Sequence, residues 1–204
     1  MTAILSPRLA IPLLMTLASI FAANHIAARL AFDHGASVAA AVTVRSGATA
    51  LAMLALLRLQ GVAMALPRVT LLRGLGIGLL VAVQSFCLYS AVAIIPVALA
   101  LLAFNTFPML FMLLTWAAGG DNPGRRAFVA MPLALFGLVL ALDILGTVEA
   151  MAGRWAEIGV GVGWALGSAV SFALVLFLTT RYLKDVDGRM RTFLTMGATA
   201  VAVG

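Results

Sequence analysis

Polar side chains that lie inside long apolar runs are the residues of this sequence that could do chemistry, because unpaired polar groups are costly in hydrocarbon. His25 and Arg29 are four residues apart, so both lie on one face of a helix, with Asn24 close to that face. His25 could carry a proton, since the ordinary pKa of histidine is about 6.5. It could equally make a hydrogen bond or contact a bound solute.

Arg45 lies about a third of the way into the second apolar run. Inserting an arginine at the centre of a membrane helix costs roughly 2.5–3.5 kcal/mol, so Arg45 must face protein or water. Two interpretations remain open. Arg45 is either a structural residue bonded to carbonyls at a helix end, or a cavity charge that attracts a carboxylate.

A proline marks a third polar position. Asn105 and Thr106 come just before Pro108, which has no N–H and therefore leaves the carbonyl of Phe104 without its helical partner. Free backbone acceptors beside side-chain amides suit a binding cavity, although a simple kink that aids packing explains the same residues.

Two more runs carry groups of polar or amphipathic side chains. A tryptophan with two hydroxyls on one helix face could wall a cavity for an apolar or aromatic solute, or the tryptophan could anchor the membrane interface. The groups are Trp164, Ser168 and Ser171 in one run, and Gln84, Ser85 and Tyr89 in the other.

Motifs for catalysis or metal binding do not accompany these residues. Both histidines, His25 and His34, lie in one run and the loop after it, and the sequence has no His-Glu-x-x-His. The one lysine, Lys184, lies in a charged segment rather than in mid-helix, where a retinal would need it. We therefore expect no enzyme, no metal and no cofactor. A channel, or a membrane-embedded enzyme or receptor of unknown ligand, remains an alternative to a transporter.

The elements that must position these side chains are transmembrane helices. The 204 residues are 64% hydrophobic and 10% charged, against about half and a quarter in globular domains. Runs of about 20 apolar residues can cross a bilayer. The pattern predicts an all-α integral membrane protein, a polytopic bundle with helices at 9–29, 37–57, 71–92, 95–117, 127–146, 158–180 and 191–204.

The distribution of basic residues predicts the orientation. If the N-terminus is cytoplasmic, ten of the thirteen Lys and Arg residues fall on the cytoplasmic side, as the positive-inside rule requires. They are also scattered at helix ends instead of forming a stripe, which argues against a nucleic-acid partner.

The first two runs are echoed in the last two. Because the second copy is offset from the first by five helices, an odd number, the copies must run in opposite directions, and inverted repeats are typical of secondary transporters. The matched pairs are Ser19 with Ser171, Arg29 with Arg181, Asp33 with Asp185, and Gly47 with Gly197. The last run is too short to span a bilayer, so we expect the chain to stop inside a helix and to lack about three helices of ten.

Several segments resemble the EamA branch of the drug/metabolite transporter superfamily. They are Ala-Ala-Asn-His-Ile-Ala-Ala-Arg at 22–29, Arg45, Leu-Tyr-Ser-Ala-Val-Ala-Ile-Ile-Pro-Val-Ala-Leu-Ala-Leu-Leu at 88–102, and Asn-Thr-Phe-Pro at 105–108. The resemblance implies ten helices in two inverted five-helix halves around a central substrate cavity. Residues 1–146 would form the first repeat, and 147–204 would begin the second. His25 departs from the family, where an apolar or aromatic residue is commoner.

By this resemblance the chain is expected to export a small metabolite, most simply an amino acid, by alternating access across the bacterial inner membrane. Its partners would be that solute and the lipid bilayer, and the oligomeric state stays open, a monomer included. The cavity candidates are Asn24, His25, Arg45, Gln84, Ser85, Tyr89, Asn105, Thr106, Trp164, Ser168 and Ser171.

Overall fold

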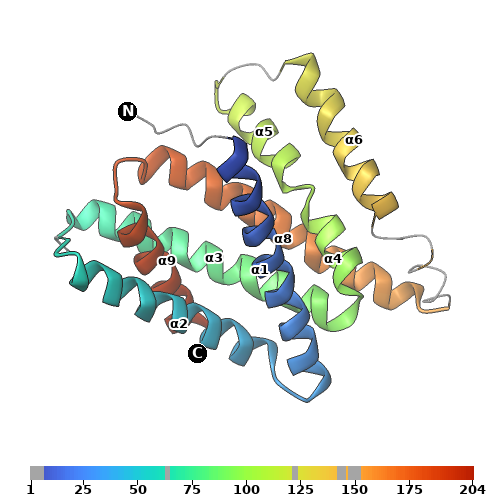
Figure 1. Cartoon of the computed structure of the whole chain (residues 1–204), viewed down its shortest axis with the longest axis horizontal. Helices are drawn as coiled ribbons and strands as arrows, with labels where there is room; N and C mark the ends of the chain where they lie inside the picture. Colours follow the sequence, from blue (N-terminus) through green and yellow to red (C-terminus); the bar gives the residue numbers. More distant parts are fainter. Residues whose placement is uncertain (1–6, 63–64, 121–123, 142–145, 147–152) are drawn as a thin grey trace.

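The computed structural model describes residues 7–62, 65–120, 124–141, 146 and 153–204. These residues form helices joined by short loops (Figure 1). Five segments are long and apolar enough to cross a membrane, so the predicted all-α polytopic class is confirmed. The helices are α1 (Pro7–Asp33), α2 (Val38–Leu59), α3 (Arg68–Ile94), α4 (Val97–Phe104), α5 (Phe107–Ala117), α6 (Arg125–Ala141), α8 (Trp155–Tyr182) and α9 (Gly188–Val203).

The helix predicted over 95–117 is broken in the structure, which separates α4 from α5 at Asn105 and Thr106. Pro108 lies in the first turn of α5, where its missing N–H does no harm. The two polar side chains satisfy the backbone at the break: Asn105 Nδ2 donates to the Leu101 carbonyl at 2.7 Å, and Thr106 Oγ1 to the Ala103 carbonyl at 2.8 Å. The single span therefore consists of two half-helices that meet at a polar joint.

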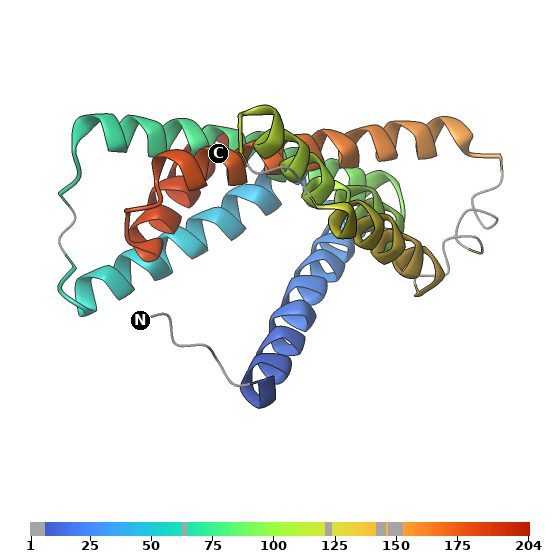
Figure 2. The same ribbon diagram turned by 90° about the horizontal axis from the view of Figure 1, so that it is seen from above.

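Helices α3, α8 and α9 form the centre of the molecule. Helix α3 is the most extensively buried and packs along α8, while α9 lies between α2 and α3 (Figures 1 and 2). Leu57 near the end of α2 meets Met190 at the start of α9, and Gly47 meets Ala200 near the end of α9. Helices α2 and α9 therefore run in opposite directions.

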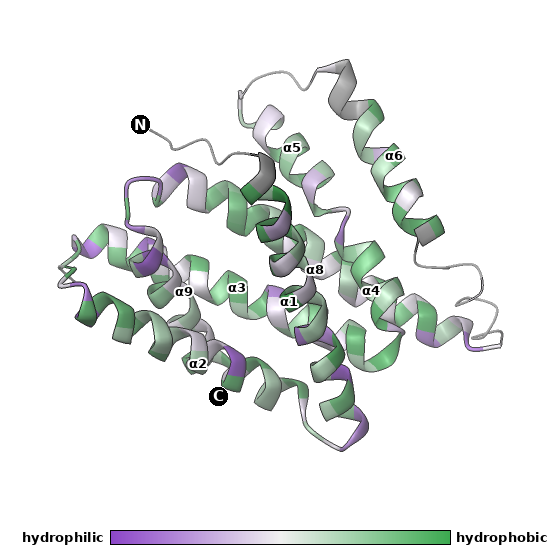
Figure 3. Cartoon of the chain, in the orientation of Figure 1, coloured by the Kyte–Doolittle hydropathy of each residue, from purple (hydrophilic) through white to green (hydrophobic). Residues whose placement is uncertain are grey.

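The outer faces of the bundle are apolar. Figure 3 shows hydrophobic residues along nearly the whole length of the helices, with hydrophilic residues concentrated near the helix ends and loops. In Figure 2, the N-terminal part of α1 projects away from the other helices, and side chains such as Leu14 and Met15 are about two-thirds exposed. Exposed apolar surface of this extent is stable only in contact with lipid or with further apolar protein surface.

Both α2 and α9 begin at a side-chain cap. Ser37 Oγ accepts a hydrogen bond from the Ala40 backbone N–H at 3.1 Å, and Asp187 accepts one from the Arg189 N–H at 2.9 Å. The Arg189 side chain also donates to Asp187, and together these bonds hold the pKa of the Asp187 carboxyl well below its usual range. The cap starts α9 at Gly188, three residues before the predicted start.

Glycines allow the closest helix contacts. A Cβ atom at Gly78 would lie 2.6 Å from the Ala198 Cβ atom, and one at Gly161 would lie 2.5 Å from Ile95 Cγ2. Gly74, four residues before Gly78, also faces α9. Gly163 instead faces open space, because the side of α8 that meets α3 carries Gly161 and Ala165.

Replacing Gly78 with alanine is expected to destabilise the contact between α3 and α9. The added methyl group overlaps Ala198 and the Thr195 backbone oxygen, 2.9 Å away, and overpacking of this kind costs about 1–3 kcal/mol. Gly76 on the same helix has nothing within 4 Å of the corresponding position. Thermal unfolding in detergent should therefore show a lower midpoint for Gly78→Ala than for the wild type, and an unchanged midpoint for Gly76→Ala. Equal midpoints for the two variants would refute the close contact.

Candidate functional site

A network of hydrogen bonds joins α1, α2, α3 and α8 near the middle of the bundle. Asn24 Nδ2 donates to Tyr89 Oη at 3.0 Å, and Arg45 approaches the same oxygen with Nη1 at 3.4 Å. Arg45 Nη2 lies 3.4 Å from Ser85 Oγ. We call the following six residues the polar network: Asn24, Arg45, Gln84, Ser85, Tyr89 and Ser168.

The far end of the polar network is fully inside the protein. Gln84 Nε2 donates to Ser168 Oγ at 3.1 Å, and Ser168 Oγ donates to the Gln84 backbone carbonyl at 3.0 Å. Ser85 Oγ in turn donates to Gln84 Oε1 at 3.3 Å. These bonds satisfy polar groups that would otherwise be costly to bury, and they fix the position of α8 against α3.

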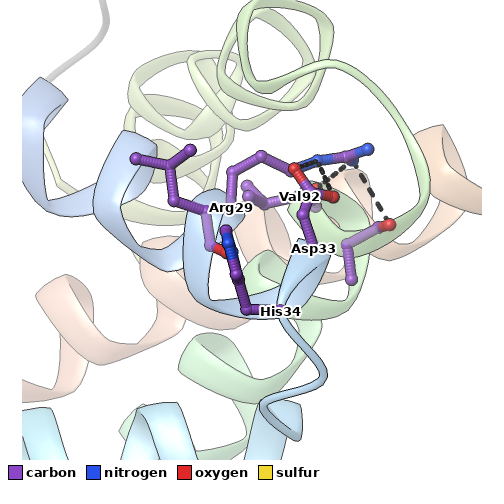
Figure 4. A network of polar contacts seen from close by, with 6 residues as sticks. Arg29, Asp33, His34 and Val92 are labelled. Atoms are coloured by element: carbon purple, nitrogen blue, oxygen red, sulfur yellow. Dashed lines mark hydrogen bonds and ion pairs between the residues drawn. The ribbon is translucent and has the colours of Figure 1, made fainter.

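Two arginines have separate roles, one at the C-terminal end of α3 and the other in the centre of this helix group. Arg29 Nη1 donates to the backbone carbonyls of Val92, at 2.9 Å, and Ala93, at 3.3 Å, and its Nε pairs with Asp33 at 3.1 Å (Figure 4). Arg29 thus satisfies carbonyls at the C-terminal end of α3, where helices leave them unpaired. Arg45 contacts side chains instead, so the helix-end role considered for Arg45 belongs to Arg29.

A cavity of about 520 Å³ lies beside the polar network, and we call it the central cavity. Helices α1, α2, α3, α8 and α9 and the joint between α4 and α5 all contribute side chains to it. Its polar lining consists of His25, Arg45, Gln84, Asn105, Thr179, Arg191, Thr192 and Thr195, and its aromatic lining of Phe21, Phe104, Phe107 and Phe172.

The central cavity has positive charge and no negative charge among the described residues that line it. Arg45 contributes one guanidinium from α2, and Arg191 contributes another from α9. The Arg45 Cζ atom lies 5.5 Å from the centre of the Tyr89 ring, in the range of a cation–π contact. The cavity therefore favours a solute that carries an anionic group on an apolar or aromatic body.

His25 lines the central cavity and has no exposed surface. Its Nδ1 atom lies 2.8 Å from the Phe21 backbone carbonyl, while Nε2 has no hydrogen-bond partner among the described residues. The His25 ring also lies between Phe21 and Tyr89, with ring centroids 4.5 and 5.8 Å away.

The remaining predicted residues lie outside the cavity lining. Thr106 bonds to the helix break beside Asn105, and Ser171 is buried in α8. Trp164 is 38% exposed, packs edge-on against Phe86 with ring centroids 6.3 Å apart, and lines a separate apolar groove. The structure thus brings Asn24, His25, Arg45, Gln84, Ser85, Tyr89, Asn105 and Ser168 together and leaves Trp164 apart from them.

The sequence interpretation missed the contribution of α9 to the cavity. The charge distribution uses Arg191 only as one of the basic residues that set the orientation, yet Arg191 lies near the start of α9 and lines the cavity. Arg191 and Thr195 are one helical turn apart, and Thr192 adds a second hydroxyl. All three residues belong to the helix predicted over 191–204, so their spacing is a signal that the sequence carries.

Comparison with known families settles the class of protein. A family model described as the EamA-like transporter family matches residues 8–142, well over half of the chain. The chain belongs to the EamA-like transporter family. This family lies within the drug/metabolite transporter superfamily, as the resemblance had indicated. No curated protein and no solved structure matches the chain.

Membership of the EamA-like family identifies the chain as a multi-pass membrane transporter and points away from an enzyme. Arg45, the polar network from α1 to α3, and the joint between α4 and α5 all lie inside the matched segment. Helices α8 and α9, which supply the second half of the cavity wall, lie beyond it. The central cavity of this EamA-like protein is consequently our candidate solute site.

Proposed function

We propose that this EamA-like protein exports amino acids across the bacterial inner membrane by alternating access, with the central cavity as the solute site. The observation that carries the proposal is Arg45, a guanidinium held in the cavity by neutral groups. Its contacts with Tyr89 and Ser85 are both 3.4 Å long, which is beyond the usual range of strong hydrogen bonds. Arg45 therefore retains donors for a carboxylate.

The size and lining of the central cavity agree with such a solute. Small-molecule sites in proteins have volumes of about 300–1,000 Å³, and most are apolar with a few polar groups that fix the orientation. The cavity falls in this range at about 520 Å³. Phe104, Phe107 and Phe172 contact one another on one wall, and they would hold an apolar side chain while Arg45 holds the carboxylate.

The arrangement of the helices supports alternating access. We propose that α1 and α2 are related to α8 and α9 as inverted repeats, with 1–146 as the first repeat and 147–204 belonging to the second. The antiparallel contact between α2 and α9 agrees with this relation. Two oppositely oriented copies around a midplane site can exchange conformations and so expose the site to either side.

The proposed orientation agrees with export. With a cytoplasmic N-terminus, the loop between α8 and α9 lies on the cytoplasmic side. Thr179, Arg191 and Thr192 extend the cavity lining toward this loop. In that orientation the cavity lining reaches toward the cytoplasmic side, where an exporter loads its solute.

Counterflow tests the proposal. The protein is reconstituted into liposomes loaded with an unlabelled amino-acid mixture, and uptake of individual labelled amino acids is followed. We expect transient accumulation of at least one amino acid, above that of protein-free liposomes. Accumulation of another solute class, with none of the amino acids, would end the proposed substrate assignment while leaving the transporter class intact.

A further inference from the structure

The central cavity has positive charge for a carboxylate, but an amino acid also brings an ammonium group that needs an acceptor. Resting on the function proposed above, we propose that His25 Nε2 is this acceptor and that His25 is a specificity residue for the α-amino group.

The hydrogen bond at Nδ1 determines what Nε2 can do. A backbone carbonyl only accepts hydrogen bonds, so the 2.8 Å contact with Phe21 places a proton on Nδ1. In the neutral ring the other nitrogen then carries a lone pair. His25 is completely buried, and this lone pair has no partner among the described residues. His25 is among the residues of the cavity wall, and a buried acceptor without a protein partner in that wall is suited to accept from a donor of the solute.

Tyr89 contacts both His25 and Arg45. The His25 and Tyr89 rings stack with centroids 5.8 Å apart and an angle of 21° between their planes. The Arg45 Cζ atom lies 5.5 Å from the same Tyr89 centroid. A cationic donor and a neutral acceptor thus contact one ring and line one cavity, and the carboxylate and ammonium of an α-amino acid require such a pair.

The other side-chain amides that line the cavity also hold acceptor oxygens. The side-chain carbonyl of Gln84 already accepts from Ser85. Asn105 donates its amide nitrogen to the Leu101 carbonyl at the joint between α4 and α5, and its oxygen can serve as a second acceptor for the solute. No Asp or Glu lies among the described lining residues. An ammonium group beside Arg45 would therefore rely on a neutral acceptor, and His25 is the one whose acceptor atom is both buried and free of a described partner.

His34 makes the same local hydrogen bond as His25, so this bond alone does not identify a solute-binding histidine. His34 Nδ1 contacts the Leu30 carbonyl at 2.7 Å, which is the same bond one helical turn back along α1. His34, however, is exposed near the end of the helix (Figure 4). It is consequently a matched control for a change at His25.

The test compares amino acids with analogues that lack the amino group. Binding of leucine and 4-methylpentanoate, and of phenylalanine and 3-phenylpropanoate, is measured on the purified protein in lipid nanodiscs. The wild type should bind each amino acid about tenfold or more tightly than its analogue, because a site built for an N–H donor leaves its acceptor unpaired with the analogue. His25→Phe keeps an aromatic ring and removes the acceptor. It should weaken amino-acid binding by about tenfold and leave the analogues unchanged.

Two further variants separate recognition from structure. His25→Gln restores an acceptor near the Nε2 position and should recover the preference for amino acids, whereas His34→Phe should match the wild type throughout. Equal weakening of amino acids and analogues by His25→Phe would overturn the inference, as would equal binding of both by the wild type. The wild-type comparison needs no variant to fold. If no amino acid binds at all, the proposed function fails and takes this inference with it.

Discussion

Replacing Arg45 with glutamine is expected to reduce amino-acid counterflow by about 10- to 100-fold while the protein stays folded. A hydrogen bond to a charged group contributes about 1.5–3 kcal/mol, and 1.4 kcal/mol corresponds to a factor of ten. Tyr89 and Ser85 can still pair with neutral partners in the variant, because Asn24 bonds to Tyr89 and Gln84 bonds to Ser85. The loss should therefore appear in substrate affinity.

Two variants control the Arg45 experiment. Arg45→Lys keeps the charge but loses the planar fork that fits a carboxylate, so it should retain part of the activity. Arg58→Gln removes an exposed arginine from the same helix and should change nothing. Full transport by Arg45→Gln, with unchanged amino-acid affinity, would show that the carboxylate binds elsewhere.

Replacing Arg29 with glutamine is expected to destabilise the attachment of α1 to the bundle. Arg29 donates to the Val92 and Ala93 carbonyls and so attaches α1 to the end of α3. Few side chains of α1 are buried in the bundle, hence little else on this helix replaces the contact. Loss of hydrogen bonds from a charged donor to carbonyls left at a helix end should cost about 1–3 kcal/mol. Thermal unfolding in detergent would show this as a lower midpoint.

The neighbouring carboxylate separates the two possible sources of this effect. Asp33 pairs with Arg29, but its side chain is about half exposed, and exposed ion pairs contribute little. Asp33→Asn should therefore unfold close to the wild type. If Asp33→Asn is as unstable as Arg29→Gln, the ion pair rather than the carbonyl contacts attaches α1.

Hydrophobicity predicted the elements well because length and apolarity alone determine which segments can span a bilayer. Helix ends were less accurate, because polar residues at the ends have local partners that hydropathy ignores. Helix α1 continues to Asp33, four residues past the predicted end, where the i,i+4 pair of Arg29 and Asp33 stabilises its last turn. Pro108 did indicate an irregularity of the helix at Asn105 and Thr106, where the structure breaks it into α4 and α5.

The meeting of side chains from different helices could not be predicted. Trp164 and Ser168 are four residues apart and share a helix face, yet Ser168 is fully buried against Gln84 and Trp164 is partly exposed. Helix α8 packs along α3, so the rotation of α8 around its own axis decides which of the two side chains faces α3. The crossing depends on close contacts such as Gly161 with Ile95, and these depend on the packing of whole helices.

Protection of cavity residues by solute tests the central claim most directly. Cys87 is the only cysteine and is buried, so a Cys87→Ser background allows one new thiol at a time. Thr179→Cys places a thiol in the lining of the central cavity, and Thr180→Cys places one on the exposed side of the same helix turn. We predict that a transported amino acid slows maleimide labelling of Thr179→Cys severalfold and leaves Thr180→Cys unaffected. An unchanged labelling rate at Thr179→Cys, with saturating concentrations of an amino acid that the protein transports, would contradict the account.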